Sequence, residues 1–360
     1  MLQIWKLLSY ISPIISYQIL GDFKSKYSGE NMIINQYEIN NITDNCHLNE
    51  IYKEALFIDI ETTGLSRKYS NIISITLLLY EDDKYKIYQM FCQYKIDQPT
   101  ALKYLRDLIK SKKYIITYNG NSFDIPFLAE KAKESNINLD FNSLIKIDLY
   151  NYIQKFKKKI NTVDLKLKTV EEYFCINRND TLSGKDVLTL YEAYQLEPRK
   201  EFSHLILMHN YEDVYNLPFI MNNIFNLYDD VIYFKNLIVT INNKDISIRK
   251  NSLLCKFNVI ANMDKDFINH SINYNMKLFV DSQALEIIIP LNFFKDENIR
   301  EFYYLDDNEY QINSYTAIKG IKRNLIPIKI NNKTYYDNIN NVIRKIMNEG
   351  FELNLKESQT

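Results

Sequence analysis

Residues 55–65 read ALFIDIETTGL and combine a strand-like apolar run with two acids. Its first six residues form a short apolar run of the kind that makes a buried strand. Asp59 lies in that run and Glu61 follows two residues later, so on a strand their side chains point to the same face. Two like charges so placed repel each other and lose solvation, and a divalent cation such as Mg²⁺ or Mn²⁺ relieves both costs.

The surroundings of this acid pair distinguish it from an ordinary one. An isolated pair with this spacing is usually only a solvated strand end. Here the pair ends a wholly apolar strand and is followed by Thr62, Thr63 and Gly64, which predict a tight turn. The stretch therefore favours a metal site at a strand end.

Outward from this strand, apolar runs alternate with helical spacings. We predict further strands at 71–80, 85–93, 114–119 and, as a strand or extended segment, 144–150. We predict helices at 100–113 and 123–134, and mostly helical structure over 150–227 with a loop at 177–186, NRNDTLSGKD. This order predicts an α/β fold whose sheet layer is covered by helices.

The chain divides into three segments by pattern. Residues 1–54 form a lead-in with weak periodicity, and residues 55–227 carry the α/β pattern. Residues 228–360 alternate or run apolar in short pieces separated by Asn and Asp, which predicts a β-rich domain. A closing helix is expected at 335–350, with Gly350 as its stop.

A second acidic motif is NGNSFDIPFL at 119–128, which follows a predicted strand and opens a predicted helix. Asp124 lies in the first turn of that helix. By itself it is readily explained as an acid that complements the helix dipole. Phe123 and Phe127 lie four residues apart and would ordinarily be core, although Phe123 could also present its ring to a flat ligand.

A third acidic motif is MHNYEDVYNL at 208–217, on a predicted helix. His209 and Asp213 are four residues apart and so share a helix face. Taken alone, they are explained as a surface pair on a helix whose Leu217 faces the core. Tyr211 is only two residues from Asp213 and is expected to point away from it.

Together the three motifs resemble those of the DEDD superfamily, the DnaQ-like 3′–5′ exonucleases, over residues 55–227. The helix at LKTVEEYF, the arginine and aspartate of NRNDTLSGKD and the element NYEDV are similar to the YprB ribonuclease H-like family. The resemblance implies a ribonuclease H-like mixed sheet flanked by helices, with a β-rich C-terminal region added.

The resemblance also implies a chemistry. Asp59, Glu61, Asp124 and Asp213 would hold two Mg²⁺ or Mn²⁺ ions, with Asp59 bridging them, for hydrolysis of phosphodiester bonds at the 3′ end of single-stranded DNA or RNA. Residues beside these ligands would contact the terminal nucleotide. They are Thr62, Leu65, Asn119 and Phe123.

One position departs from the family pattern. These enzymes place a His five residues before the last Asp, or a Tyr four residues before it. Here Met208 stands five residues before Asp213, and His209 stands four before it. An imidazole accepts protons near neutral pH, so we expect His209 to be the general base.

Other functions remain open from the sequence. The fold also suits a non-catalytic nucleic-acid-binding module or a structure-specific endonuclease. A full set of four acids argues against the first. The basic run Lys155, Lys157, Lys158 and Lys159 is a candidate phosphate track, although such a run is more often a solvated helix face.

Composition sets the remaining expectations. The net charge of -1 gives no overall nucleic-acid signal. Four cysteines lie far apart without a C-x-x-C pair, as expected of buried free thiols in a reducing compartment. The apolar start, MLQIWKLLSYISPIISYQIL, is interpreted as a packed segment rather than a secretory signal. We therefore expect a cytoplasmic protein without a membrane span, and a monomer by default.

Overall fold

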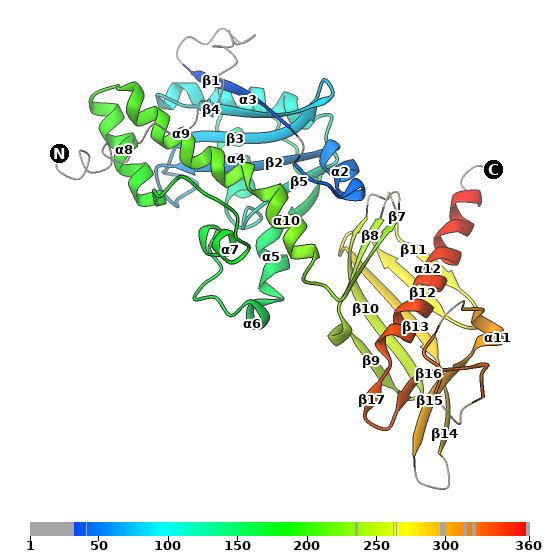
Figure 1. Ribbon diagram of the computed structural model, residues 1–360. Coiled ribbons are helices and arrows are strands. Elements are labelled where there is room, and N and C mark those ends of the chain that lie inside the picture. Colours follow the sequence, from blue (N-terminus) through cyan, green and yellow to red (C-terminus); the bar gives the residue numbers. More distant parts are fainter. Residues whose placement is uncertain are drawn as a thin grey trace. The chain divides into compact units, whose positions relative to one another are not determined.

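The computed structural model describes residues 32–357, apart from 41, 235–236, 262, 264, 296–299, 313–314 and 319–321. The predicted packed segment at the start of the chain lies outside the described residues. The chain divides into two compact units, the first ending at Leu227 and the second beginning at Tyr228 (Figure 1).

The first unit is built on a mixed six-stranded sheet in the order β1-β4-β3-β2-β5-β6. Strands β1 to β4 pair antiparallel, whereas β2, β5 and β6 run parallel. The strands are β1 (Ile33–Ile39), β2 (Ala55–Thr62), β3 (Ile72–Glu81), β4 (Lys84–Phe91), β5 (Tyr114–Thr117) and β6 (Ile145–Asp148).

Helices cover both faces of this sheet (Figure 1). On one face, apolar residues of α3 and α4 pack with Leu56, Ile58 and Ile60 of β2. On the other face, α8 and α9 pack with Ile73 and Phe91. The helices are α2 (Cys46–Lys53), α3 (Gln98–Ile109), α4 (Asp124–Glu134), α5 (Leu149–Gln154), α6 (Lys157–Ile160), α7 (Leu167–Tyr173), α8 (Gly184–Leu196), α9 (Lys200–Tyr215) and α10 (Leu217–Phe225).

The predicted order of strands and helices from residue 55 onward is confirmed, and β6 is a true strand. The lead-in has more structure than its weak periodicity suggested. Strand β1 pairs along its whole length with β4, from Ile33 opposite Phe91 to Ile39 opposite Tyr85, and α2 follows it. The alternation of β1 is weak because most of its residues are only half-buried at the sheet edge.

The second unit is β-rich, as predicted. Its described residues form a seven-stranded sheet, β11-β12-β13-β10-β8-β7 with β9 beside β10, and a four-stranded sheet, β14-β15-β16-β17. The strands are β7 (Asp230–Phe234), β8 (Leu237–Ile241), β9 (Ile246–Arg249), β10 (Ser252–Ala261), β11 (Phe267–His270), β12 (Asn275–Phe279), β13 (Ala284–Pro290), β14 (Asn292–Lys295), β15 (Glu301–Asp306), β16 (Leu325–Ile330) and β17 (Lys333–Thr334).

Helix α12 (Tyr336–Glu357) packs Ile339, Val342 and Ile343 into the core of this unit, and the short α11 (Asp307–Tyr310) follows β15. The prediction that Gly350 stops the closing helix is wrong, since α12 continues past it. A Cβ at Gly350 would lie 2.3 Å from the terminal methyl of Met276, so the glycine lets helix and sheet approach closely.

The thiols and the helices bear on two further expectations. The four cysteines are free thiols, but only Cys92 and Cys255 are buried, and Cys46 and Cys175 are exposed, so burial was predicted correctly for two. Among the described residues, no helix is both long enough and apolar enough to cross a membrane.

Candidate active site

The first two acids lie on the central strand of the first unit. Asp59 is paired with Thr76 of β3 and Glu61 with Ser74, and the pairing register shifts immediately after Glu61. The strand period of two turns both acids toward α9, whereas Ile58 and Ile60 enter the opposite core. Both carboxylates therefore lie at the end of β2, between the sheet and α9.

The third acid, Asp124, begins α4 and is 4% exposed. Strand β5 ends at Thr117 while its neighbour β2 continues to Thr62. Beyond the end of β5, the backbone N–H of Ile60 donates to the Oδ1 of Asp124 at 3.1 Å. A backbone donor of β2 thus holds Asp124 beside the first two acids.

The turn that leads into Asp124 is held by Asp148, for which no role was predicted from the sequence. Asn119 adopts the left-handed conformation, with φ of 63°. Asp148, at the end of β6, accepts the backbone N–H of Asn119 at 2.7 Å and that of Asn121 at 3.1 Å. Asp148 is 3% exposed, and its carboxylate fixes the turn from the neighbouring strand.

Helix α9 supplies the other side of the site. Asn210, which is fully buried, donates to Asp59 Oδ2 at 2.7 Å and accepts from the hydroxyls of Ser74 and Thr76. Gln89 of β4 extends this chain by donating to the Thr76 hydroxyl at 3.1 Å. The sequence offered only the N-x-x-D-V spacing as a signal for Asn210.

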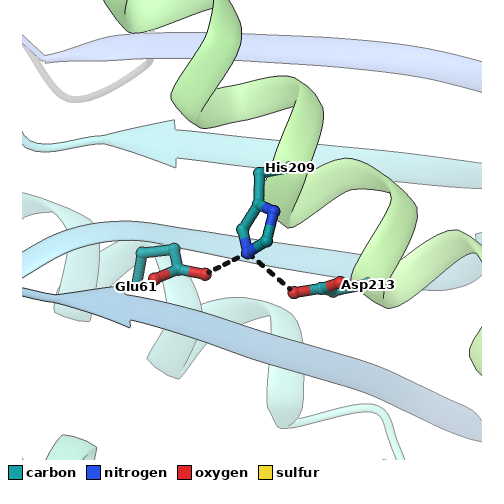
Figure 2. A group of neighbouring side chains, drawn as sticks. All are labelled: Glu61, His209 and Asp213. Atoms are coloured by element: carbon teal, nitrogen blue, oxygen red, sulfur yellow. Dashed lines mark ion pairs between the residues drawn. The ribbon is translucent and has the colours of Figure 1, made fainter. Parts of the chain in front are cut away.

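His209 and Asp213 lie one helical turn apart on α9 and face Glu61 (Figure 2). His209 Nε2 is 3.4 Å from Glu61 Oε1 and 3.5 Å from Asp213 Oδ2. Tyr211 points elsewhere, as expected, and its ring lies 5.3 Å from that of Tyr37 on β1. Among the described residues, the group of possible metal donors within 4.8 Å of one another is Glu61, His209 and Asp213.

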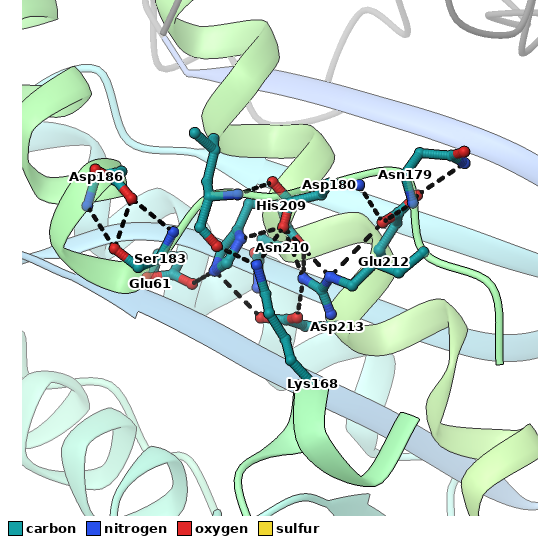
Figure 3. A network of polar contacts seen from close by, with 12 residues as sticks. Glu61, Lys168, Asn179, Asp180, Ser183, Asp186, His209, Asn210, Glu212 and Asp213 are labelled. Atoms are coloured by element: carbon teal, nitrogen blue, oxygen red, sulfur yellow. Dashed lines mark hydrogen bonds and ion pairs between the residues drawn. The ribbon is translucent and has the colours of Figure 1, made fainter. Parts of the chain in front are cut away.

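The loop between α7 and α8 adds two charged residues, Arg178 and Asp180, of which Asp180 is labelled beside His209 in Figure 3. Arg178 Nη2 lies 2.5 Å from Asp213 Oδ1, and Asp180 Oδ2 lies 2.6 Å from His209 Nδ1. Both loop side chains are almost fully buried, 8% and 3% exposed. The sequence placed them in a motif but gave them no task.

The four predicted metal ligands form one electrostatic group. Burial raises the pKa of Asp59 well above its usual range, and the charges of Asp124, Asp213 and Glu61 raise it further. Burial raises the pKa of Glu61 to about 8, and the same cause raises that of Asp124 to about 7. In Asp124 the hydrogen bond from Ile60 opposes the rise. The pKa values of Glu61 and Asp124 thus lie near neutral pH, where burial and repulsion disfavour their ionised forms when no cation is beside them.

The histidine and its partner shift in opposite directions. Burial alone would lower the pKa of His209, but Asp213, Asp180 and Glu61 outweigh it and raise the pKa. Burial alone would raise the pKa of Asp180, but its hydrogen bond to His209 and the charges of His209 and Arg178 hold it below its usual range. Asp180 is therefore an ionised carboxylate beside the imidazole.

This donor set fits a divalent cation. Carboxylate oxygens are the ligands that Mg²⁺ and Mn²⁺ prefer, and a cation would relieve the repulsion that raises these pKa values. Glu61 and Asp213 could hold such an ion together with the ring nitrogen of His209, because their donor atoms lie within 4.8 Å of one another. Asp59 and Asp124, the other two acids predicted from the sequence as ligands, are electrostatic neighbours of this group.

The four predicted nucleotide contacts lie beside these elements. Leu65 is 86% exposed in the turn after β2, and the Thr62 hydroxyl donates to the carbonyl of Gly64 at 2.9 Å. Asn119 is exposed, and its side chain accepts from Ser122 at 2.8 Å. Phe123 is half-buried and packs against Phe127, with 5.6 Å between ring centroids.

The lysine run is exposed, with Lys155 just after α5 and the other three lysines on α6. Lys159 donates to the carbonyl of Leu227 at 2.9 Å, and the amine of Lys155 lies 5.0 Å from the Tyr152 ring centroid. At least these two lysines therefore have intramolecular partners.

Comparison with known proteins identifies the fold of the first unit. Residues 56–225 match the sequence model of the RNase_H superfamily. This part of the chain has the ribonuclease H-like fold. The mixed sheet with helices on both faces, predicted from the three acidic motifs, is thereby confirmed. No curated protein matches the chain.

Solved structures show more distant likeness. A family B DNA polymerase from the hyperthermophilic archaeon Pyrobaculum calidifontis is 18% identical over 48% of this chain, with a TM-score of 0.40. The match spans a quarter of that polymerase's length. A nuclease in its apo form is 16% identical, with a TM-score of 0.31, and the match covers 51% of this chain and 76% of the nuclease. An exonuclease I is 12% identical, with a TM-score of 0.31, and the match covers 56% of this chain and 54% of that exonuclease.

Proposed function

We propose that the protein is a metal-dependent 3′–5′ exonuclease that hydrolyses the terminal phosphodiester bond of single-stranded DNA or RNA. Asp59, Glu61, Asp124 and Asp213 hold two divalent ions, Mg²⁺ or Mn²⁺, and His209 is the general base. The β-rich second unit is a separate domain. We further propose that the protein is a monomer and that it is located in the cytoplasm.

One observation carries it: donor atoms of Glu61, His209 and Asp213 lie within 4.8 Å of one another, and burial and the charges of neighbouring acids raise the pKa values of Asp59, Glu61 and Asp124 around them. Buried acids that repel each other cost stability, so their convergence needs a use. On a ribonuclease H-like fold, cation binding for phosphodiester hydrolysis is the use that fits the oxygen donors.

The chain's own residues have distinct parts in this chemistry. Divalent ions bound by the carboxylates would acidify the attacking water and neutralise charge on the leaving 3′ oxygen. His209, with its Nε2 facing Glu61 and Asp213, takes the proton from that water. Thr62, Leu65, Asn119 and Phe123 contact the terminal nucleotide, with the Phe123 ring as a stacking surface.

The decisive experiment uses 3′- and 5′-labelled single-stranded DNA and RNA oligonucleotides with Mn²⁺, Mg²⁺ or EDTA. We expect metal-dependent shortening from the 3′ end, abolished in Asp59→Asn and in Asp124→Asn. Asp83→Asn, an exposed acid in the turn between β3 and β4, is the matched control and should cleave normally. Absence of cleavage with every metal, while the oligonucleotide still binds, would favour a non-catalytic binding module.

A circular single-stranded substrate tests the alternative that the protein is an endonuclease. Because an exonuclease needs an end, the circle should survive while the linear oligonucleotide of the same sequence is degraded. Cleavage of the circle would replace the proposal with an endonuclease on the same fold.

His209→Gln separates the roles of base and ligand. As a base, His209 contributes to turnover but not to ion binding, so the variant should bind Mn²⁺ normally by calorimetry and lose about 10²–10⁴-fold in kcat. A matching loss of Mn²⁺ affinity would make His209 a ligand. Unchanged turnover between pH 6 and 9 would remove it from the chemistry.

A further inference from the structure

We propose that the loop segment Arg178–Asp180 is a positioning device, in which Asp180 fixes the imidazole of His209 and Arg178 fixes the carboxylate of Asp213. This inference deepens the proposed function and rests on it for its catalytic consequence. Each residue acts through a side chain of α9, Asp180 through His209 (Figure 3) and Arg178 through Asp213.

The loop is attached to α9 by Glu212, which is 4% exposed. The Glu212 carboxylate accepts the backbone N–H of Asn179 at 3.0 Å and that of Asp180 at 2.8 Å, and it also accepts the Asn179 side-chain amide at 3.1 Å. Three charge-assisted hydrogen bonds to one buried carboxylate fix the loop backbone against the helix turn that carries His209 and Asp213.

The surroundings of Asp180 decide which nitrogen of His209 carries a proton. Besides His209, the Asp180 carboxylate receives Arg178 Nη2 and Lys168 Nζ at 2.9 Å each, and the backbone N–H of Leu182 at 2.9 Å. A carboxylate among these donors can only accept, so His209 Nδ1 donates to it. In the neutral ring, the lone pair therefore lies on Nε2, which faces Glu61 and Asp213.

Arg178 determines which carboxylate oxygen of Asp213 faces His209. Its guanidinium is fixed by Glu171, whose two oxygens lie 3.0 and 3.1 Å from Nη1, and Asn216 in turn donates to Glu171 at 2.9 Å. The planar fork then places Nη2 against Asp213 Oδ1. Only Oδ2 is left to face His209 and Glu61, which is the orientation that a cation between them requires.

Asp180→Asn tests the histidine half, because it keeps the shape but removes the acceptor-only character. In metal-free protein labelled with ¹⁵N at histidine, at a pH where the ring is neutral, His209 should be protonated at Nδ1 in the wild type. In Asp180→Asn the Nε2–H form should appear. His209→Gln identifies the signal among the four histidines. Asp186→Asn, which alters a helix-capping carboxylate of the same region, is the matched control and should leave the signal unchanged.

Arg178→Lys tests the carboxylate half, since a lysine keeps the charge but lacks the fork. We expect Mn²⁺ affinity, measured by calorimetry, to fall about 10–100-fold, which is usual for loss of a residue that orients a metal ligand. For Asp180→Asn we expect kcat to fall with KM within about twofold of the wild type. Asp186→Asn should match the wild type in both.

The two proposals fail separately. If His209 keeps its protonated Nδ1 in Asp180→Asn and Arg178→Lys binds Mn²⁺ like the wild type, the positioning device is overturned, even if the protein degrades oligonucleotides. If both changes occur but no nucleic acid is cleaved by the wild type, the nuclease function fails and the positioning device stands. Thermal melting of each variant beside Asp186→Asn shows whether a global loss of folding has produced the result.

Discussion

The side-chain amide of Asn210 lies 2.7 Å from Oδ2 of Asp59 and donates a hydrogen bond to it. The oxygen of the same amide accepts from the hydroxyls of Ser74 at 2.9 Å and Thr76 at 2.6 Å. Asn210 is fully buried, so it joins α9 to β2 and β3 from inside the molecule and fixes the orientation of one acid.

Replacing Asn210 by Ala should therefore destabilise the protein and not only affect its site. Asp59 loses a donor, and two buried hydroxyls lose an acceptor. Leaving a buried polar group unsatisfied costs about 1–3 kcal/mol, so we expect the free energy of unfolding to fall by at least that amount in urea titrations. Asn223→Ala, which removes one half-buried hydrogen bond from the side-chain amide to the Phe219 carbonyl, should lower the free energy of unfolding less. Equal losses in the two variants would show that the Asn210 network is not special.

What the sequence could predict about this site is what local geometry determines. The strand period of two places Asp59 and Glu61 on one face, and the helical period brings His209 and Asp213 together. Each relation needs only residues within four positions of one another. The order of strands and helices along the chain from residue 55 followed from the same local patterns.

The contacts that organise the site depend on tertiary register and lie beyond such patterns. Asn210 meets Thr76, 134 residues away, because β3 pairs with β2 in one particular register. Asp180 reaches His209 only after its loop has docked on Glu212. Strand β1 was missed for the same reason, since its pairing with β4 spans more than 40 residues.

Neutralising an acid of the cluster should stabilise the metal-free protein. In Asp59→Asn the buried charge and its repulsion with Asp124 and Asp213 disappear. With EDTA at pH 8.5 we expect a higher melting temperature than in the wild type. The wild type should gain about 2.7 kcal/mol from Mn²⁺ at a hundred times its dissociation constant, a gain that Asp59→Asn largely loses. If Mn²⁺ stabilised Asp59→Asn as much as the wild type, Asp59 would not be a ligand.

The stability of the metal-free protein should also fall as pH rises. The pKa is raised to about 8 in Glu61 and about 7 in Asp124, above their ordinary values near 4. Between these limits the folded state binds more protons than the unfolded state, so the free energy of unfolding decreases with increasing pH. Urea titrations with EDTA at pH 5, 6.5 and 8 measure the slope. Glu61→Gln should flatten it, and a slope of opposite sign in the wild type would contradict the raised values.

The turn before Asp124 offers a steric test with a matched pair of glycines. A Cβ at Gly120 would lie 2.5 Å from the Cβ of Thr117, so Gly120→Ala must displace the turn from the end of β5. Overpacking of this kind costs about 1–3 kcal/mol. Because the displaced turn carries Asn119 and leads into Asp124, we expect Mn²⁺ affinity to fall as well as stability.

Gly184, the first residue of α8, has no atom within 4 Å of its Cβ position, and alanine favours a helix over glycine. Gly184→Ala should therefore leave stability unchanged or raise it by up to about 1 kcal/mol, with Mn²⁺ affinity untouched. Urea titration and calorimetry on both variants make the comparison. Full Mn²⁺ affinity in a destabilised Gly120→Ala protein would mean that Asp124 keeps its place without help from the turn, through its hydrogen bond from Ile60 alone.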